Sequence, residues 1–142
     1  MPIPIADIQN NESGAAVRAK LNEVIGYTNT GPLRVYRALL SQSGNTAPTA
    51  IVLSNSVGAI VWTRTNAGIY AGTLNGAFPS GKVLILVGAG IADSPYLLHY
   101  YLARSSNDTL LFRTVNIDVV AGTMVLSDDM TTNLSVEIAV YP

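Results

Sequence analysis

The segment that decides the fold runs from Leu39 to Phe78 and reads LLSQSGNTAPTAIVLSNSVGAIVWTRTNAGIYAGTLNGAF. Three short runs within it, APTAIVL, AIVWTRT and GIYAGTL, are rich in aliphatic, aromatic and threonine residues. Clusters of Gly, Asn and Ser separate these runs at intervals of about ten residues, which is typical of consecutive antiparallel strands. The tripeptide Asn66-Ala67-Gly68 suits a short hairpin loop with a left-handed residue. The pattern predicts a chain that is mainly β.

Further strands are predicted on both sides of this segment: RVYRALLSQ (34–42), KVLILV (82–87), residues 109–117 and residues 134–140. The last of these alternates strictly between apolar and other residues, as a half-buried strand does. The run KVLILV is apolar throughout, so it should be covered on both faces or meet a neighbouring subunit with its second face. Residues 97–104, LLHYYLAR, suit either a strand or a helix.

About eight strands without intervening helices are enough for two packed sheets. We therefore expect an antiparallel β-sandwich, of jelly-roll-like or related topology, preceded by a short N-terminal α-helix. Trp62 is the only tryptophan. Because large buried rings contribute strongly to stability, we expect it to form the centre of the core with Tyr70 and Leu74. Val136 and Ile138 should join them from the last strand.

The N-terminal part of the chain is predicted to differ from the rest. Pro2 and Pro4 favour an extended arm over residues 1–12, and Ser13 and Gly26 are suited to begin and end a helix over residues 13–26. Residues 27–33 follow as a linker, and residues 34–142 form the β-sandwich domain. The apolar stripe of the helix consists of Val17, Leu21, Val24 and Ile25.

A helix of this length is marginal alone in water, since helices below about 12–15 residues seldom repay the cost of nucleation. It therefore needs a partner. One alternative is that its stripe packs on the β-domain of the same chain. The other is that it packs against the same helix in other copies, or against a different protein.

Composition narrows the classes of function. Charged residues make up 12% of the chain, against about 25% in an average soluble protein, which favours burial in an oligomer or larger assembly. The net charge of −1 argues against a nucleic-acid binder, which needs clustered Lys and Arg. The chain contains no cysteine, which excludes disulfides and thiolate metal sites. We expect a soluble protein, because there is no signal-peptide pattern and the longest apolar run, residues 83–92, is about half of a membrane span.

No residue is assigned to catalysis, to a metal or to a cofactor. The glycines of GAGIAD (88–93) resemble the start of a dinucleotide fingerprint, but the third glycine and the βαβ context are missing. His99 lies in an apolar and aromatic run without an evident Ser or Asp partner. The pair Asp128-Asp129 has no spaced set of oxygen ligands around it, so an exposed turn is expected there.

Two parts of the chain resemble phage proteins. Residues 12–26, ESGAAVRAKLNEVIG, resemble a segment near the start of bacteriophage fibre and fibre-attachment proteins. Residues 36–82, with YRALLSQSGNTAPTAIVL, VWTR and GIYAGTLNGAFPSGK, and the chain end VEIAVYP are similar to a small β-domain of Bacteroidota and their phages, including crAss-like phages.

The resemblance implies a non-enzymatic structural component of the virion, assembled in the host cytoplasm. Such a head or tail fibre, spike or capsid-decorating protein would be attached or trimerised through its N-terminal segment and would project its β-domain. Its partners would be itself, most often as a trimer, and capsid, portal or tail proteins, without nucleic acid or membrane insertion. At 142 residues a short spike or decoration is favoured over a long fibre. The alternative is a module that recognises a host-surface glycan or protein through its β-loops.

Overall fold

The computed structural model describes residues 13–29, 31–88, 96–128 and 131–142. The chain divides into an N-terminal unit that ends at Leu33 and a β-domain, Arg34–Tyr141. The predicted arm, residues 1–12, lies outside the described residues. The boundary between the two units lies at residue 34, where the first strand begins.

The described residues of the N-terminal unit form the helix α1 (Gly14–Asn29). Ser13 caps it: the Ala16 amide donates to the Ser13 hydroxyl (3.3 Å) and the Val17 amide to the Ser13 carbonyl (3.1 Å). The predicted end at Gly26 is wrong, because the helix continues to Asn29 and takes the first part of the predicted linker with it. A glycine inside a helix costs only about 1 kcal/mol relative to alanine, so it does not by itself end one.

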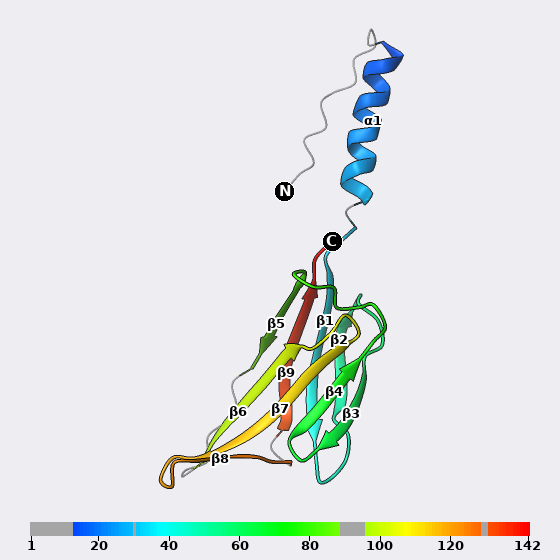
Figure 1. Ribbon diagram of the computed structural model, residues 1–142. Coiled ribbons are helices and arrows are strands. Elements are labelled where there is room, and N and C mark those ends of the chain that lie inside the picture. The colour runs from blue at the N-terminus through cyan, green and yellow to red at the C-terminus, as the bar shows by residue number, and fades with distance from the viewer. Residues whose placement is uncertain (1–12, 30, 89–95, 129–130) are drawn as a thin grey trace. The chain divides into compact units, whose positions relative to one another are not determined.

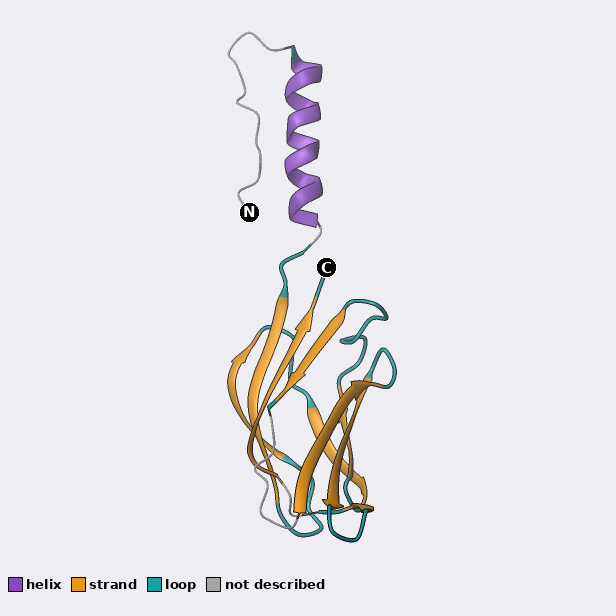
Figure 2. Cartoon of the chain, turned by 90° about the vertical axis from the view of Figure 1, so that its left-hand side faces the viewer, coloured by secondary structure: helices purple, strands orange, loops and turns teal. Residues whose placement is uncertain are grey.

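The β-domain consists of two antiparallel sheets, which appear as two layers in Figures 1 and 2. Sheet A has the strand order β2-β1-β9-β5, and sheet B has the order β3-β4-β7-β6 with β8 paired to β7. The strands of sheet A are β1 (Arg34–Gln42), β2 (Thr49–Asn55), β5 (Val83–Val87) and β9 (Thr131–Val140). Those of sheet B are β3 (Val61–Asn66), β4 (Ile69–Thr73), β6 (Tyr96–Arg104), β7 (Thr109–Asp118) and β8 (Thr123–Leu126).

This architecture confirms the predicted antiparallel β-sandwich, preceded in the sequence by an N-terminal helix. Residues 97–104 form a strand, β6, which decides between the two structures left open for them. The described residues form nine strands where about eight were expected, and β8 is the one that sequence patterns did not indicate. The hairpin loop at residues 66–68 has its left-handed residue at Gly68, with φ of 62°.

The core lies between the two sheets. Sheet A contributes alternate side chains of β1 and β9, among them Val136 and Ile138, and sheet B contributes side chains from β3, β4, β6 and β7. Trp62 is 8% exposed, and its ring meets Phe112 edge to face at 6.3 Å between ring centroids. Tyr70 is fully buried, and Leu74 packs against this cluster at its margin.

The strand β5 departs from one prediction. Its inward side chains, Val83, Ile85 and Val87, pack against the core, but Leu84 and Leu86 are exposed. The prediction that the chain itself covers both faces of β5 is therefore wrong, because the described part of the chain leaves the second face of sheet A open. The other alternative, contact with a neighbouring subunit, stays a prediction.

Candidate interaction surface

The outer face of sheet A exposes aliphatic side chains along its two edge strands. Strand periodicity places the side chains on alternate faces, so the residues between the buried positions of β1 and β9 point outward. Large aliphatic side chains are exposed on both edge strands: Ile51 and Leu53 on β2, and Leu84 and Leu86 on β5. We call these the β2 rim and the β5 rim.

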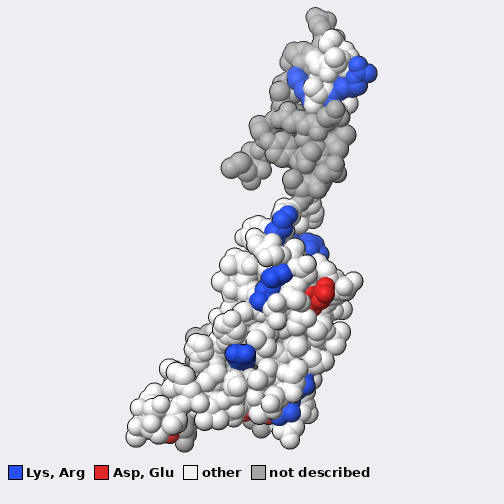
Figure 3. All heavy atoms as spheres, in the orientation of Figure 1, with Lys and Arg blue, Asp and Glu red and all other residues white. Residues whose placement is uncertain are grey.

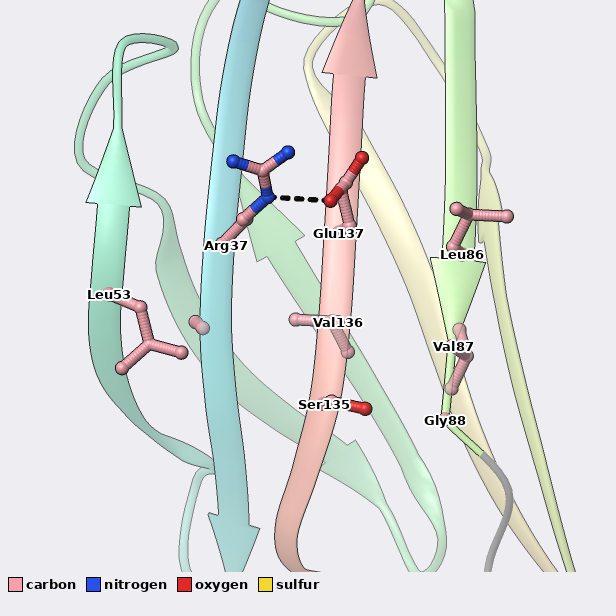
Figure 4. Close-up of a pocket in the computed structure, with 9 residues that line it drawn as sticks. Arg37, Leu53, Leu86, Val87, Gly88, Ser135, Val136 and Glu137 are labelled. Carbon is pink, nitrogen blue, oxygen red and sulfur yellow. Dashed lines mark hydrogen bonds and ion pairs between the residues drawn. The ribbon is translucent and has the colours of Figure 1, made fainter.

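A shallow groove of about 370 Å³ lies between the rims. Figure 4 shows Leu53 on one side of it and Leu86 on the other, with β1 and β9 between them. The lining residues are Arg37, Ala38, Leu53, Leu86, Val87, Gly88, Ser135, Val136 and Glu137. The volume is within the range of small-ligand sites, roughly 300–1,000 Å³, but the groove is open along the sheet, which suits a protein surface better than an enclosed molecule.

One ion pair crosses the groove. The Nε of Arg37 donates to Oε2 of Glu137 at 2.6 Å, and the two residues are direct neighbours in the β1–β9 ladder. Their side chains are 51% and 32% exposed, so this pair contributes about 0–1 kcal/mol to stability. Its main effect is that the two charges neutralise each other and leave the surface electrically balanced.

Gly88 closes one end of the groove. Its amide donates to the Ser135 carbonyl at 2.8 Å, and a Cβ at this position would collide with the Ser135 hydroxyl oxygen. A side chain at position 88 would therefore require the Ser135 side chain to move. The rest of the segment with the dinucleotide-like glycines, residues 89–95, lies outside the described residues.

Charged side chains are sparse on the β-domain. Figure 3 shows that Lys, Arg, Asp and Glu cover little of its visible face. His99 is exposed on β6 in sheet B, away from the groove of sheet A. In the part of the chain that the structure describes, no group of three or more His, Asp or Glu residues is arranged to hold a metal ion. The groove lining consists of aliphatic surface, the Ser135 hydroxyl and one paired Arg and Glu.

A cluster of polar groups lies at sheet B, and the sequence patterns did not predict it. Asp128 accepts hydrogen bonds from Arg64 (Nη2 to Oδ2, 2.7 Å), from the Tyr70 hydroxyl (2.6 Å) and from the Gly68 amide (3.1 Å). The expected exposed turn at Asp128 is wrong, since the side chain is only 13% exposed. Sequence separations of about sixty residues leave no local signal for such a cluster.

The electrostatics of this cluster follow from its contacts. The Arg64 guanidinium, together with the Tyr70 hydroxyl, holds the pKa of Asp128 well below its usual range, against the opposing effect of burial. Burial and the hydrogen bond to Asp128 raise the pKa of Tyr70 to about 12. Both shifts favour the states that bind each other, the ionised carboxylate and the neutral phenol. The cluster ties the segment after β8 to the β3–β4 hairpin, which is a structural role.

The helix residues assigned to attachment are described only in part. Val17 is half-buried and Leu21 is 48% exposed. The side chains of Val24 and Ile25 lie outside the described residues, so the stripe is seen at two of its four positions. No helix among the residues that are described is long and apolar enough to cross a membrane.

The fold and this surface together define a two-sheet β-sandwich that exposes aliphatic side chains on the outer face of sheet A. Comparisons with protein-family models, with curated proteins and with solved structures found no match. The resemblance to phage proteins therefore stays a prediction.

Proposed function

We propose that the protein is a non-enzymatic structural component of a phage particle. In this role it is attached or trimerised through its N-terminal segment and projects its β-domain from the head or tail. The observation that carries the proposal is the outer face of sheet A, where Leu53 is 63% exposed and Leu86 is 53% exposed. Contiguous exposed apolar patches of a few hundred Å² are often functional in soluble proteins. The virion as the place of assembly rests on the resemblance of residues 12–26 and 36–82 alone.

The N-terminal unit supports the same role. It is separate from the β-domain, which has its own core, and α1 presents Leu21 to solvent. A helix with an exposed leucine gains stability by packing its apolar side on a partner. We assign this partner to other copies of the helix or to a capsid, portal or tail protein.

Deletion of residues 1–26 tests the attachment role. The truncated chain should keep a folded β-domain, measured by circular dichroism and cooperative unfolding, but fail to enter particles in a complementation assay. A finer test is Leu21→Lys, which should lower incorporation, against Ala19→Lys at a neighbouring exposed helix position, which should not. Normal incorporation of the folded, truncated protein would refute the proposal.

One observation favours the alternative function, recognition of a host-surface glycan or protein. Leu97, His99 and Tyr101 are exposed at alternate positions of β6, on the outer face of sheet B. An exposed aromatic ring beside a polar ring is suited to contact a sugar face. A glycan array with the full chain and with Tyr101→Ala separates the two functions: binding that depends on Tyr101 supports recognition, and absence of any binding supports a purely structural role.

A further inference from the structure

We propose that the outer face of sheet A binds further copies of this chain, related by a rotation axis parallel to the strands, so that Leu53 of one copy lies against Leu86 of the next. In this contact the occupant of the groove is a second copy of the chain. The contact rests on the function proposed above only in taking this face as a binding surface.

Charge determines the chemistry of the occupant. Between Arg37 and Arg64 the chain has no charged residue, so β2 carries none, and β5 consists of five aliphatic residues. The only charges on the groove, Arg37 and Glu137, already bind each other. The fitting partner is therefore apolar and uncharged along its contact. The two rims themselves have this composition, and no like charges would be opposed if one rim met the other.

The two edge strands also lack the usual protection. Natural sheet edges carry Lys, Pro or inward charges that prevent pairing with other chains. No such residue lies within the bounds of β2 or β5, although the exposed Lys82 directly precedes β5. In β2 the consecutive residues Ile51, Val52 and Leu53 are all exposed, so apolar surface is presented on both faces of this edge strand. An unprotected edge of this kind is expected at a contact between subunits.

Strand direction selects the orientation of the copies. β2 is antiparallel to β1, β1 to β9, and β9 to β5, so β2 and β5 of one chain run in opposite directions. Copies related by an axis along the strands all point the same way. The β2 strand of one copy then lies antiparallel to β5 of its neighbour, and the β2 rim meets the β5 rim. This orientation also brings the N-terminal ends of all β-domains to one side, as attachment through the N-terminal segment requires.

The area of the face sets the strength of the contact. Four strands about 4.8 Å apart, paired over some five residues, cover roughly 300 Å² per copy. A stable interface buries about 800 Å² per partner. The face alone is therefore too small for a stable complex. It should act together with the N-terminal unit, and its loss should weaken the assembly without abolishing attachment.

Cysteine cross-linking of the full chain tests the contact, because the parent has no cysteine. The variants are Leu53→Cys, Leu86→Cys and the double variant. Within one chain the two positions are three strand spacings apart, roughly 14 Å, whereas a disulfide needs Cα atoms within about 7 Å. Any disulfide between positions 53 and 86 therefore joins two copies. The matched control is Leu53→Cys with Met124→Cys, since Met124 is exposed on sheet B.

Under oxidation the double variant should form covalent oligomers at least several-fold more than the control, and reductant should release them. An equimolar mixture of the two single variants should give dimers, whereas each single variant alone should stay uncross-linked. Cross-linking of Leu53→Cys alone as efficient as that of the double variant would overturn the proposal. So would equal cross-linking of the double variant and the control. Either of these results leaves the incorporation test of residues 1–26 unaffected, so the two proposals fail separately.

Discussion

Arg64 and Asp128 form an ion pair, with 2.7 Å between Nη2 and Oδ2, that joins strand β3 of sheet B to the segment after β8. The same carboxylate accepts a hydrogen bond from the buried Tyr70 hydroxyl. Among the described residues, Arg37 and Glu137 form a second ion pair, at 2.6 Å but more exposed. The two pairs have the same chemistry and different surroundings, and their effects on stability should differ accordingly.

We expect Asp128→Ala to lower the free energy of unfolding by about 1–3 kcal/mol, because the buried Tyr70 hydroxyl and the Gly68 amide lose their acceptor. The control is Glu137→Ala, whose exposed pair is worth about 0–1 kcal/mol. Urea denaturation of both variants measures the difference. Equal losses would contradict the structural role of the Asp128 cluster.

The stability of the β-domain should decline in alkaline solution. The pKa of Tyr70 is raised from its ordinary value to about 12 by burial and by the hydrogen bond to Asp128. A folded-state pKa above the unfolded value of about 10 gives a contribution that is complete below pH 10 and is lost as the pH rises towards 12. The measurement is the free energy of unfolding between pH 8 and pH 12 in the parent and in Tyr70→Phe. The variant should show the shallower decline, and identical slopes would count against this environment for Tyr70.

Gly68 should tolerate substitution much less than Gly122. Both residues have positive φ, 62° and 66°, so alanine costs about 1 kcal/mol at either from backbone strain. At Gly68 a Cβ would also lie 2.7 Å from the Thr114 carbonyl oxygen, which is backbone, whereas nothing is within 4 Å of a Cβ at Gly122. Gly68→Ala should therefore destabilise the domain clearly more than Gly122→Ala in thermal unfolding. Similar melting temperatures for the two variants would contradict the close approach.

Substitution of a rim residue should change association and leave folding intact. Leu86→Lys places a charge at an exposed position, where substitutions usually alter stability by less than about 0.5 kcal/mol. The charge would oppose the apolar β2 rim of a neighbouring copy. In sedimentation experiments, the oligomer of the variant should therefore dissociate at protein concentrations at which the parent is still associated. Met124→Lys, at a more exposed position on sheet B (72% against 53% for Leu86), should behave like the parent. If both lysine variants sediment alike, sheet A has no special role in association.

The fold was largely predictable, because its signals are local. Alternation in residues 134–140 and the Asn66-Ala67-Gly68 loop each depend on a few neighbouring residues, and they correspond to β9 and to the β3–β4 hairpin. The strand β8 was not predicted, since it has only four residues, TMVL, which do not alternate between apolar and polar types. All four are exposed in the structure. The end of α1 was missed because Gly26 suits a cap by type, while the helix in fact continues past it.

The candidate surface was only half predictable. The run KVLILV indicated a strand with apolar residues on both faces, and this led to the expectation of a neighbouring subunit. The matching rim on β2 gave no such signal, because Ile51 and Leu53 lie in a segment that reads as ordinary core strand. Whether an aliphatic side chain points to the core or to solvent depends on which sheet covers it, and that is a property of the tertiary fold.

The mass of the full chain in solution tests the central claim most directly. Sedimentation equilibrium at micromolar concentration should give a homo-oligomer, with a trimer as the expected size, and Leu86→Lys or deletion of residues 1–26 should shift it towards smaller species. A parent chain that remains a stable monomer at that concentration would contradict the account.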